Sequence, residues 1–185
     1  PYTRYTMDEL VADLYAITQK LKLPEQFTLV AHSFGGSIAV EYANAHPEQL
    51  DKLVLIATAG EYPLPWFAKW LLKLPLNWLR PFWKYRTRFD AEIHVVKNMM
   101  ANNMQHWQGW SLMRNITTPT LIITGERDNY FPRRVFEDVG KMIPDAEVID
   151  VGSAKHKVQL ERYQAVPRAI ERFADGRQRT WRDAI

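Results

Sequence analysis

The amino-acid sequence predicts an α/β fold in which a mostly parallel sheet is flanked by helices. Short apolar runs alternate with helical patterns along the chain, and this alternation is typical of parallel sheets. A serine, an aspartate and a histidine each follow one of these runs, at the sheet edge where such folds gather their chemistry. The 185 residues, 46% of them hydrophobic and 24% charged, are enough for one globular core.

The first predicted helix covers residues 6–21, where apolar residues recur at helical spacing. Thr6 and Glu9 stand three residues apart at its start, as in a capping box. The apolar run FTLVA at 27–31 is predicted to form a short buried strand. The same signals predict the remaining elements as strands at 52–57, 119–125 and 146–151 and as helices at 37–45, 91–114, 132–143 and 158–173, the last kinked at Pro167.

Residues 62–89 differ in composition from the rest of the chain. They hold nine aromatic residues and six lysines or arginines but no aspartate or glutamate, and prolines cut them into short pieces. The segment belongs to an insert much longer than the dozen or so residues that a crossover between parallel strands needs. We therefore divide the chain into an incomplete core at 1–60 and 115–175, a helical cap at 61–114 and a polar tail at 176–185.

The composition excludes several classes of function. The absence of cysteine excludes disulfides, thiolate metal sites and a cysteine nucleophile. A formal net charge of +3 is too small to indicate a nucleic-acid partner. No signal peptide and no apolar run of bilayer length is found, so we expect a cytoplasmic protein that is at most peripheral to a membrane. We also expect it to need no metal and no other cofactor.

The stretch VAHSFGG places Ser33 between the first predicted strand and the helix that follows. A chain that turns at once from strand to helix passes one residue through a strained backbone conformation, and the neighbours of that residue must be small. Ala31, Gly35 and Gly36 meet this need. The pattern predicts Ser33 as a nucleophile, with the backbone N–H of Phe34 facing the oxyanion.

A nucleophilic serine needs a base that a carboxylate holds in place. His156 lies beyond the last predicted strand, where it can meet the serine, whereas strand alternation directs the ring of the neighbouring His32 elsewhere. Asp128 is the preferred acid, because it follows a strand and precedes a helix in the order Ser, Asp, His. The remaining candidates are Asp51, Glu126 and Asp150 for the acid and His46, His94 and His106 for the base.

These motifs together resemble those of the α/β-hydrolase superfamily, in its group of small bacterial-type esterases. VAHSFGG is similar to the nucleophile elbow of that family, TPTLIITGERD to its acid strand and loop, and VGSAKHKVQLERYQAVPRAIERF to its histidine loop and last helix. The resemblance covers nearly the whole chain apart from residues 61–114. It implies Ser33 as the nucleophile, His156 as the base and Asp128 as the acid.

Three features depart from the family pattern. Ala31 stands in the first glycine position of the elbow, and Lys155 stands where a glycine often precedes the catalytic histidine. The four strands that come before the elbow strand in the family are not found, nor is the loop that gives its second oxyanion donor. We therefore expect the amino-terminal half of the fold to come from the same parent chain or from another chain.

The resemblance and the motifs predict a serine hydrolase that cleaves an ester or related acyl bond of an apolar small substrate. Thioesterases, carbon–carbon bond hydrolases and hydroxynitrile lyases share the same three residues, so the sequence does not separate these activities. The alternative is a catalytically silent fragment or subunit that uses the fold for binding or assembly. Activity on a short p-nitrophenyl ester discriminates the two.

The predicted cap has two interpretations. It is either a roof whose aromatic side chains pack on the core, or a lid whose cationic, tryptophan-rich outer face contacts an anionic membrane surface through residues 62–89. Both interpretations predict a preference for apolar acyl groups. The candidate residues of the substrate pocket are His32 and Tyr130 and, from the cap, Trp66, Trp70, Trp107 and Trp110.

Overall fold

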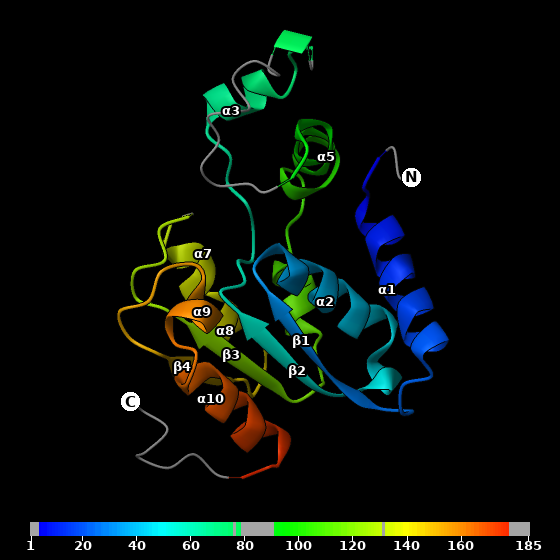
Figure 1. Ribbon diagram of the computed structural model, residues 1–185, viewed down its shortest axis with the longest axis vertical. Coiled ribbons are helices and arrows are strands. Elements are labelled where there is room, and N and C mark those ends of the chain that lie inside the picture. Colours follow the sequence, from blue (N-terminus) through cyan, green and yellow to red (C-terminus); the bar gives the residue numbers. More distant parts are fainter. Residues whose placement is uncertain (1–3, 76, 79–90, 131, 178–185) are drawn as a thin grey trace.

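The computed structural model describes residues 4–75, 77–78, 91–130 and 132–177, and it shows a four-stranded, all-parallel sheet. The strands are β1 (Phe27–His32), β2 (Leu50–Ile56), β3 (Thr120–Thr124) and β4 (Glu147–Asp150), and they lie in this order across the sheet (Figure 1). The α/β fold predicted from the sequence is therefore confirmed, with strand bounds close to those expected.

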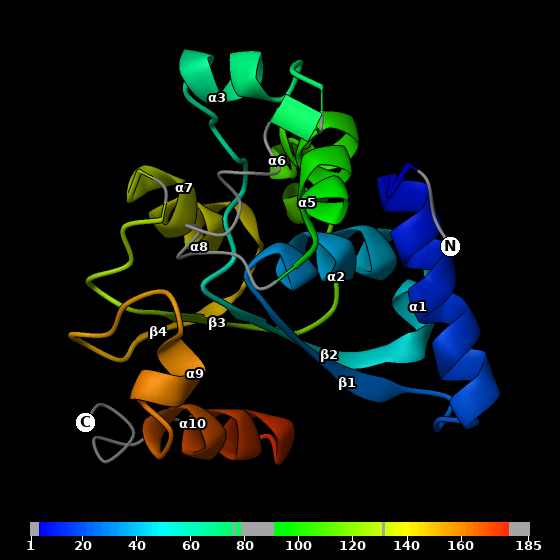
Figure 2. The same ribbon diagram turned by 45° about the horizontal axis from the view of Figure 1, so that its top comes forward.

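Helices cover both faces of the sheet (Figure 2). One face carries α1 (Met7–Leu21), α2 (Phe34–Ala45), α6 (Trp110–Arg114), α7 (Arg134–Glu137) and α8 (Val139–Met142), and the other carries α9 (Val158–Glu161) and α10 (Ala165–Ala174). Alternate strand residues supply the two cores, since side chains of a strand point to opposite faces in turn. Leu53 and Leu55 thus belong to the first core, and Val54 and Ile56 to the second.

The ends of α1 follow the expected local chemistry. The N–H of Glu9 donates to the Thr6 hydroxyl at 3.4 Å, and the N–H of Thr6 donates to the Glu9 carboxylate at 3.0 Å. The predicted capping box is therefore confirmed. The helix ends at Lys22, which takes the left-handed backbone conformation.

Three predicted helices differ in the structure. Residues 132–143 form the two short helices α7 and α8, and 91–114 form α5 (Ile93–Met99), a π-helical turn (Met100–Met104) and, after a loop, α6. The last predicted helix is split into α9 and α10. Pro167 does not kink a continuous helix, as we expected, but is the third residue of α10, where a missing N–H breaks no hydrogen bond within the helix.

The expectation of a buried first strand is wrong for β1. This strand has one neighbour among the described residues and lies at the edge of the sheet, with Val30 45% exposed. Val30, together with Val166 and Ile170 of α10, lines an apolar hollow of about 460 Å³ beside this edge.

The two ends of the inserted segment between β2 and β3 lie side by side where the segment joins the core. The N–H of Gly109 donates to the carbonyl of Gly60 at 2.9 Å, and Glu61 forms an antiparallel bridge with Gln108. Between these points lies α3 (Trp66–Leu71), which stands apart from the sheet beyond the carboxyl ends of its strands (Figure 1). No helix in the described part of the chain is both long and apolar enough to cross a membrane.

Candidate active site

The strand-to-helix junction holds Ser33 in a rare backbone conformation. Ser33 has φ 56° and ψ −126°, in a region that residues other than glycine seldom occupy, between the end of β1 and the start of α2. Its N–H donates to the Ile56 carbonyl of the next strand at 2.9 Å, and its carbonyl accepts from the Gly36 N–H at 2.9 Å. These bonds hold the strained turn and lift the serine side chain away from the sheet.

Gly36 lets the first turn of α2 pack closely against the residues that follow β2. A Cβ atom at this position would lie 1.9 Å from the side-chain oxygen of Thr58, a residue in the buried segment that follows β2. The first turn of α2 can therefore lie this close to the sheet only without a side chain at Gly36. Gly35, by contrast, has no atom within 4 Å of an added Cβ, so its small size is not required by packing against described residues.

Replacement of Gly36 by alanine is expected to lower the free energy of unfolding by about 1–3 kcal/mol, as overpacking of a core does. The matched control is Gly35→Ala, which we expect to leave stability unchanged or slightly raised, because alanine favours a helix over glycine. Urea titration of both variants measures the difference. Equal destabilisation by the two substitutions would contradict the close contact with Thr58.

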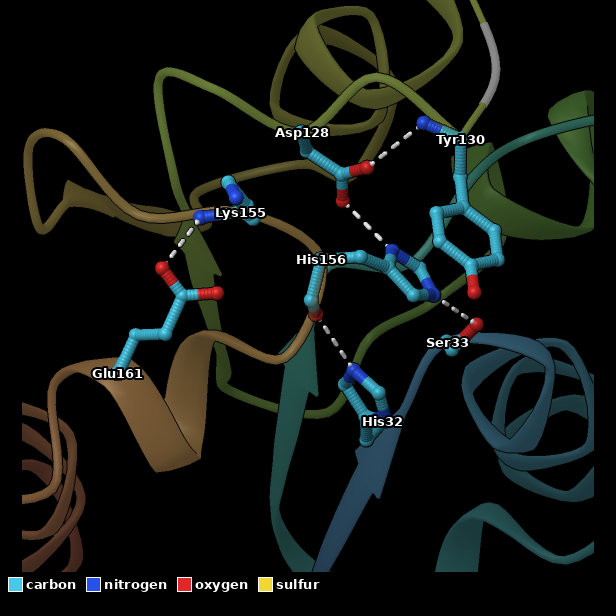
Figure 3. Close-up of polar contacts among 7 residues, drawn as sticks. All are labelled: His32, Ser33, Asp128, Tyr130, Lys155, His156 and Glu161. Atoms are coloured by element: carbon cyan, nitrogen blue, oxygen red, sulfur yellow. Dashed lines mark hydrogen bonds and ion pairs between the residues drawn. The ribbon is translucent and has the colours of Figure 1, made fainter. Parts of the chain in front are cut away.

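Three side chains form a continuous hydrogen-bonded chain at the carboxyl ends of the strands. The Ser33 Oγ lies 2.7 Å from His156 Nε2, and His156 Nδ1 lies 2.7 Å from Asp128 Oδ2 (Figure 3). His156 and Asp128 are both buried, each 9% exposed. A carboxylate only accepts hydrogen bonds, so Nδ1 carries the proton of the neutral imidazole and Nε2 is left to accept the hydroxyl proton of Ser33.

The loop after β3 fixes the carboxylate. Asp128 Oδ1 accepts a hydrogen bond from the N–H of Tyr130 at 3.2 Å, while Oδ2 faces the imidazole. The loop also approaches the histidine loop closely, because a Cβ on Gly125 would lie 2.6 Å from the carbonyl oxygen of Ala154. The two loops that follow β3 and β4 are thus held together by short contacts around the Asp128–His156 pair.

Aromatic rings enclose the His156 imidazole. The Tyr130 ring stacks on it with centroids 4.2 Å apart and planes 16° apart, and the Phe136 ring is tilted at 6.3 Å. The stacked tyrosine covers one face of the imidazole, which limits its rotation and the access of water. Tyr130 was a candidate pocket residue, and the structure places it directly at the site.

His32 contacts the histidine loop rather than a substrate groove. Its Nε2 lies 2.8 Å from the backbone carbonyl of His156, to which it donates, and the two rings are 5.1 Å apart. Burial is the main cause that lowers the pKa of His32, so its ring is neutral at pH 7 and Nε2 carries the proton. From strand alternation we expected the His32 ring to point away from Ser33, and we did not predict its hydrogen bond with the His156 carbonyl.

The other candidate acids and bases lie in different surroundings. The Asp150 carboxylate accepts from the Gly152 N–H at 2.7 Å, and Asp51 pairs with Lys52 at 2.6 Å. His46 is half-buried and stacks on the Tyr15 ring, with the ring centroids 4.4 Å apart. The backbone N–H of Lys155 donates to Glu161 at 3.2 Å, and this lysine is exposed (Figure 3).

An open groove of about 850 Å³ runs between the inserted segment and the loop that holds Asp128. Its lining is largely apolar and comprises Pro63, Leu64, Pro65, Phe67, Ala68 and Met100 from the inserted segment and Asp128, Asn129, Tyr130, Pro132 and Arg133 from the loop and the residues after it. The acid of the hydrogen-bonded chain therefore shares a wall with a groove suited to an apolar group.

The four predicted tryptophans do not line this groove. Trp66 and Trp70 are 81% and 56% exposed on the outer side of α3. The indole N–H of Trp107, which is buried, donates to Glu41 at 2.9 Å, and that of Trp110 donates to Glu61 at 3.4 Å. The apolar lining comes instead from their smaller neighbours, because composition alone does not say which face of a short helix turns inward.

Known proteins are similar in sequence to most of this chain. The chain is 25% identical over 215 residues to a cis-3-alkyl-4-alkyloxetan-2-one decarboxylase of Xanthomonas campestris, covering 95% of this chain and 72% of that protein. It is 29% identical over 174 residues to a poly(3-hydroxyalkanoate) depolymerase of Ectopseudomonas oleovorans, covering 80% of this chain and 60% of that protein.

Solved structures give the same fold. The carboxylesterase CesB of Bacillus subtilis matches with a TM-score of 0.69 at 17% identity, over 95% of this chain and 69% of that one. The meta-cleavage product hydrolase CumD of Pseudomonas fluorescens matches with a TM-score of 0.68 at 20% identity, over 93% and 72%. The family model of the alpha/beta hydrolase fold matches residues 1–111, more than half of the sequence, and the chain therefore belongs to the alpha/beta hydrolase family.

Proposed function

We propose that this protein is a serine hydrolase that cleaves an ester or related acyl bond of an apolar small substrate. The observation that carries the proposal is the chain of two 2.7 Å hydrogen bonds from Ser33 through His156 to Asp128, with the serine on a strained strand-to-helix turn. A serine hydroxyl becomes a strong nucleophile when an oriented imidazole takes its proton.

The proposed reaction has two halves. Ser33 Oγ attacks the carbonyl carbon of the substrate while its proton passes to His156 Nε2, and Asp128 stabilises the imidazolium that forms. The oxyanion is stabilised by the backbone N–H of Phe34, the first residue of α2, where N–H groups have no partner within the helix. Collapse of this intermediate breaks the acyl–oxygen bond, and the leaving alcohol takes the proton from His156.

The acyl-enzyme that results is then hydrolysed by the same groups. Water attacks the acyl carbon and gives a proton to His156 Nε2, and collapse of the second intermediate returns that proton to Ser33 Oγ. The carboxylic acid product leaves, and the resting hydrogen-bonded chain is restored. No redox step and no external proton store is needed.

The groove beside Asp128 supports an apolar substrate. Its cap wall is formed by proline, leucine, phenylalanine, alanine and methionine side chains, none of which carries a charge. Among the similar proteins, CesB is a carboxylesterase and the Ectopseudomonas protein is a depolymerase of a poly(3-hydroxyalkanoate). Both names agree with cleavage of an ester bond. The apolar lining of the groove adds that the acyl or alkyl group of the substrate is apolar.

Hydrolysis of p-nitrophenyl esters tests the proposal. We expect butyrate and octanoate esters to be cleaved with a higher kcat/KM than the hemisuccinate ester, because burial of an apolar chain in the groove is favourable by about 0.8 kcal/mol per CH₂ whereas the carboxylate must be desolvated. A fluorophosphonate should label the protein at one residue, and peptide mapping should identify Ser33. Absence of both hydrolysis and labelling would overturn the proposal.

A second candidate is a catalytically silent chain that uses the fold for assembly, and the open edge of β1 favours it. Val30 is 45% exposed on this edge, and a strand edge with no second neighbour among the described residues is suited to binding a further strand. The loop that follows such a strand would also be the source of the second oxyanion donor, and loss of one donor typically costs about 10²–10³ in kcat. Binding of a partner segment at this edge, with no fluorophosphonate labelling in its presence or absence, would favour this candidate.

A further inference from the structure

Helix α3 carries a cluster of four large, exposed apolar side chains, three of which are aromatic. Trp66 is 81% exposed, Trp70 56%, Phe67 52% and Leu71 39%, and all four lie on α3. We name these four residues the α3 aromatic patch. The Trp66 and Phe67 rings contact each other edge to face, with their centroids 6.3 Å apart, so two side chains of the patch also pack on each other. Trp78, farther along the chain, is 67% exposed as well.

Two lysines lie beside the apolar side chains of the patch, so this surface of α3 is amphipathic. At 100° per residue, Trp66, Trp70, Phe67 and Leu71 cover one arc of the helix surface, while Lys69 and the following Lys73 lie at one edge of that arc. Both lysines are exposed, and neither has an acidic neighbour in sequence, since residues 62–89 contain no aspartate or glutamate.

The exposure of these side chains argues against a purely structural role. A tryptophan that roofs the core is buried, as Trp107 is at 7% exposure, whereas Trp66 leaves four fifths of its surface in solvent. Large aromatic side chains gathered on one surface mark a contact with an apolar partner. Phe67 and Ala68 of the same helix line the wall of the groove, so one side of α3 faces the groove, and Phe67 lies at the border between that side and the exposed tryptophans.

The charges beside the patch indicate the kind of apolar partner. Tryptophan rings lie preferentially at the boundary between water and acyl chains, and lysines bind the anionic headgroups at that boundary. A short helix with both features lies in the plane of a lipid surface. Figure 1 shows α3 at the far end of the molecule from α10, so a flat surface reaches this helix before it reaches the sheet.

We propose that the α3 aromatic patch binds an anionic lipid surface, with Lys69 and Lys73 contacting the headgroups. The proposal does not depend on the catalytic role of Ser33. It places the mouth of the groove beside the bilayer, since Phe67 belongs to both the patch and the groove wall.

Co-sedimentation with vesicles tests the proposal. The protein is mixed with vesicles of phosphatidylcholine alone or of phosphatidylcholine with 30–40% phosphatidylserine (roughly the anionic content that gives a strong surface potential), at low and high salt. We expect binding to the anionic vesicles at low salt, weakened at high salt. Lys69→Glu with Lys73→Glu should weaken binding by about 30-fold or more, since each basic residue near such a surface contributes roughly fivefold.

Two further variants separate the patch from general charge and from protein contacts. Lys20→Glu with Arg168→Glu makes the same change in net charge on exposed residues of α1 and α10, and it should leave vesicle binding within about twofold. Trp66→Ser with Trp70→Ser should abolish binding at both salt concentrations. Equal, negligible binding of the wild-type protein to both kinds of vesicle would overturn the proposal. Self-association that the tryptophan variant abolishes, without vesicle binding, would overturn it in favour of a second copy of the chain.

Discussion

Replacement of Ser33 by alanine is expected to lower kcat for a short p-nitrophenyl ester by about 10⁶-fold, the loss that follows removal of a serine nucleophile from a working triad. The Oγ atom is the only group of this residue that reaches His156 Nε2, and alanine leaves the backbone of the elbow in place. Initial rates at saturating substrate measure the effect, and thermal unfolding verifies that the variant is folded.

The comparison of single and double variants sharpens this prediction. His156→Ala should be nearly as damaging as Ser33→Ala, and the double variant should lose little more than either single one, because the two groups act as a unit. The matched control is Ser111→Ala, a substitution at an exposed serine of α6, which should leave kcat unchanged. Activity or fluorophosphonate labelling that persists in Ser33→Ala would place the nucleophile elsewhere.

Asp128→Asn should lower kcat by about 10⁴-fold. An asparagine has nearly the same shape, but its amide offers an N–H to the ring where the carboxylate offered only lone pairs, and the imidazole then takes the tautomer with its proton on Nε2. In that tautomer Nε2 cannot accept the proton of Ser33. The loss should appear in kcat with little change in stability, since Tyr130 still donates to the remaining oxygen.

Asp150→Asn is the control for the acid assignment. Asp150 ends the neighbouring strand β4 and accepts a hydrogen bond from the Gly152 N–H, so an asparagine oxygen can replace it with little effect on the rate. Steady-state kinetics of the two variants decide between them. A mild Asp128→Asn and a damaging Asp150→Asn would transfer the role of the acid to Asp150.

The sequence was informative wherever a local rule determines the local structure. The parallel alternation of strands and helices, the capping box of α1 and the position of Ser33 at a strained turn all depend on neighbouring residues. The meeting of Ser33, Asp128 and His156 also followed, since parallel strands end at one edge of their sheet. These features needed no knowledge of distant contacts.

Features that depend on distant contacts were missed. Exposure of Val30 follows from the absence of a second neighbour of β1 among the described residues, which the apolar run itself does not reveal. The side of α3 that faces the groove depends on how the helix is attached to the core, so the sequence did not indicate that Trp66 and Trp70 are exposed and do not line this groove. His32 bonds a carbonyl 124 residues away in the chain, and no spacing in the sequence indicates such a pair.

The hydrogen bond between Gly60 and Gly109 has a consequence for how this protein can change over evolutionary time. Because Gly60 and Gly109 are hydrogen-bonded to each other, the segment between them is a loop whose two ends are held together at the core. The loss of entropy on closing such a loop raises the free-energy cost by only about 0.6 kcal/mol for each doubling of the loop's length. Caps of quite different length and sequence can therefore be exchanged at this junction by recombination. Such an exchange would change both the groove wall and the outer face of α3 and leave the Ser33, His156 and Asp128 geometry intact.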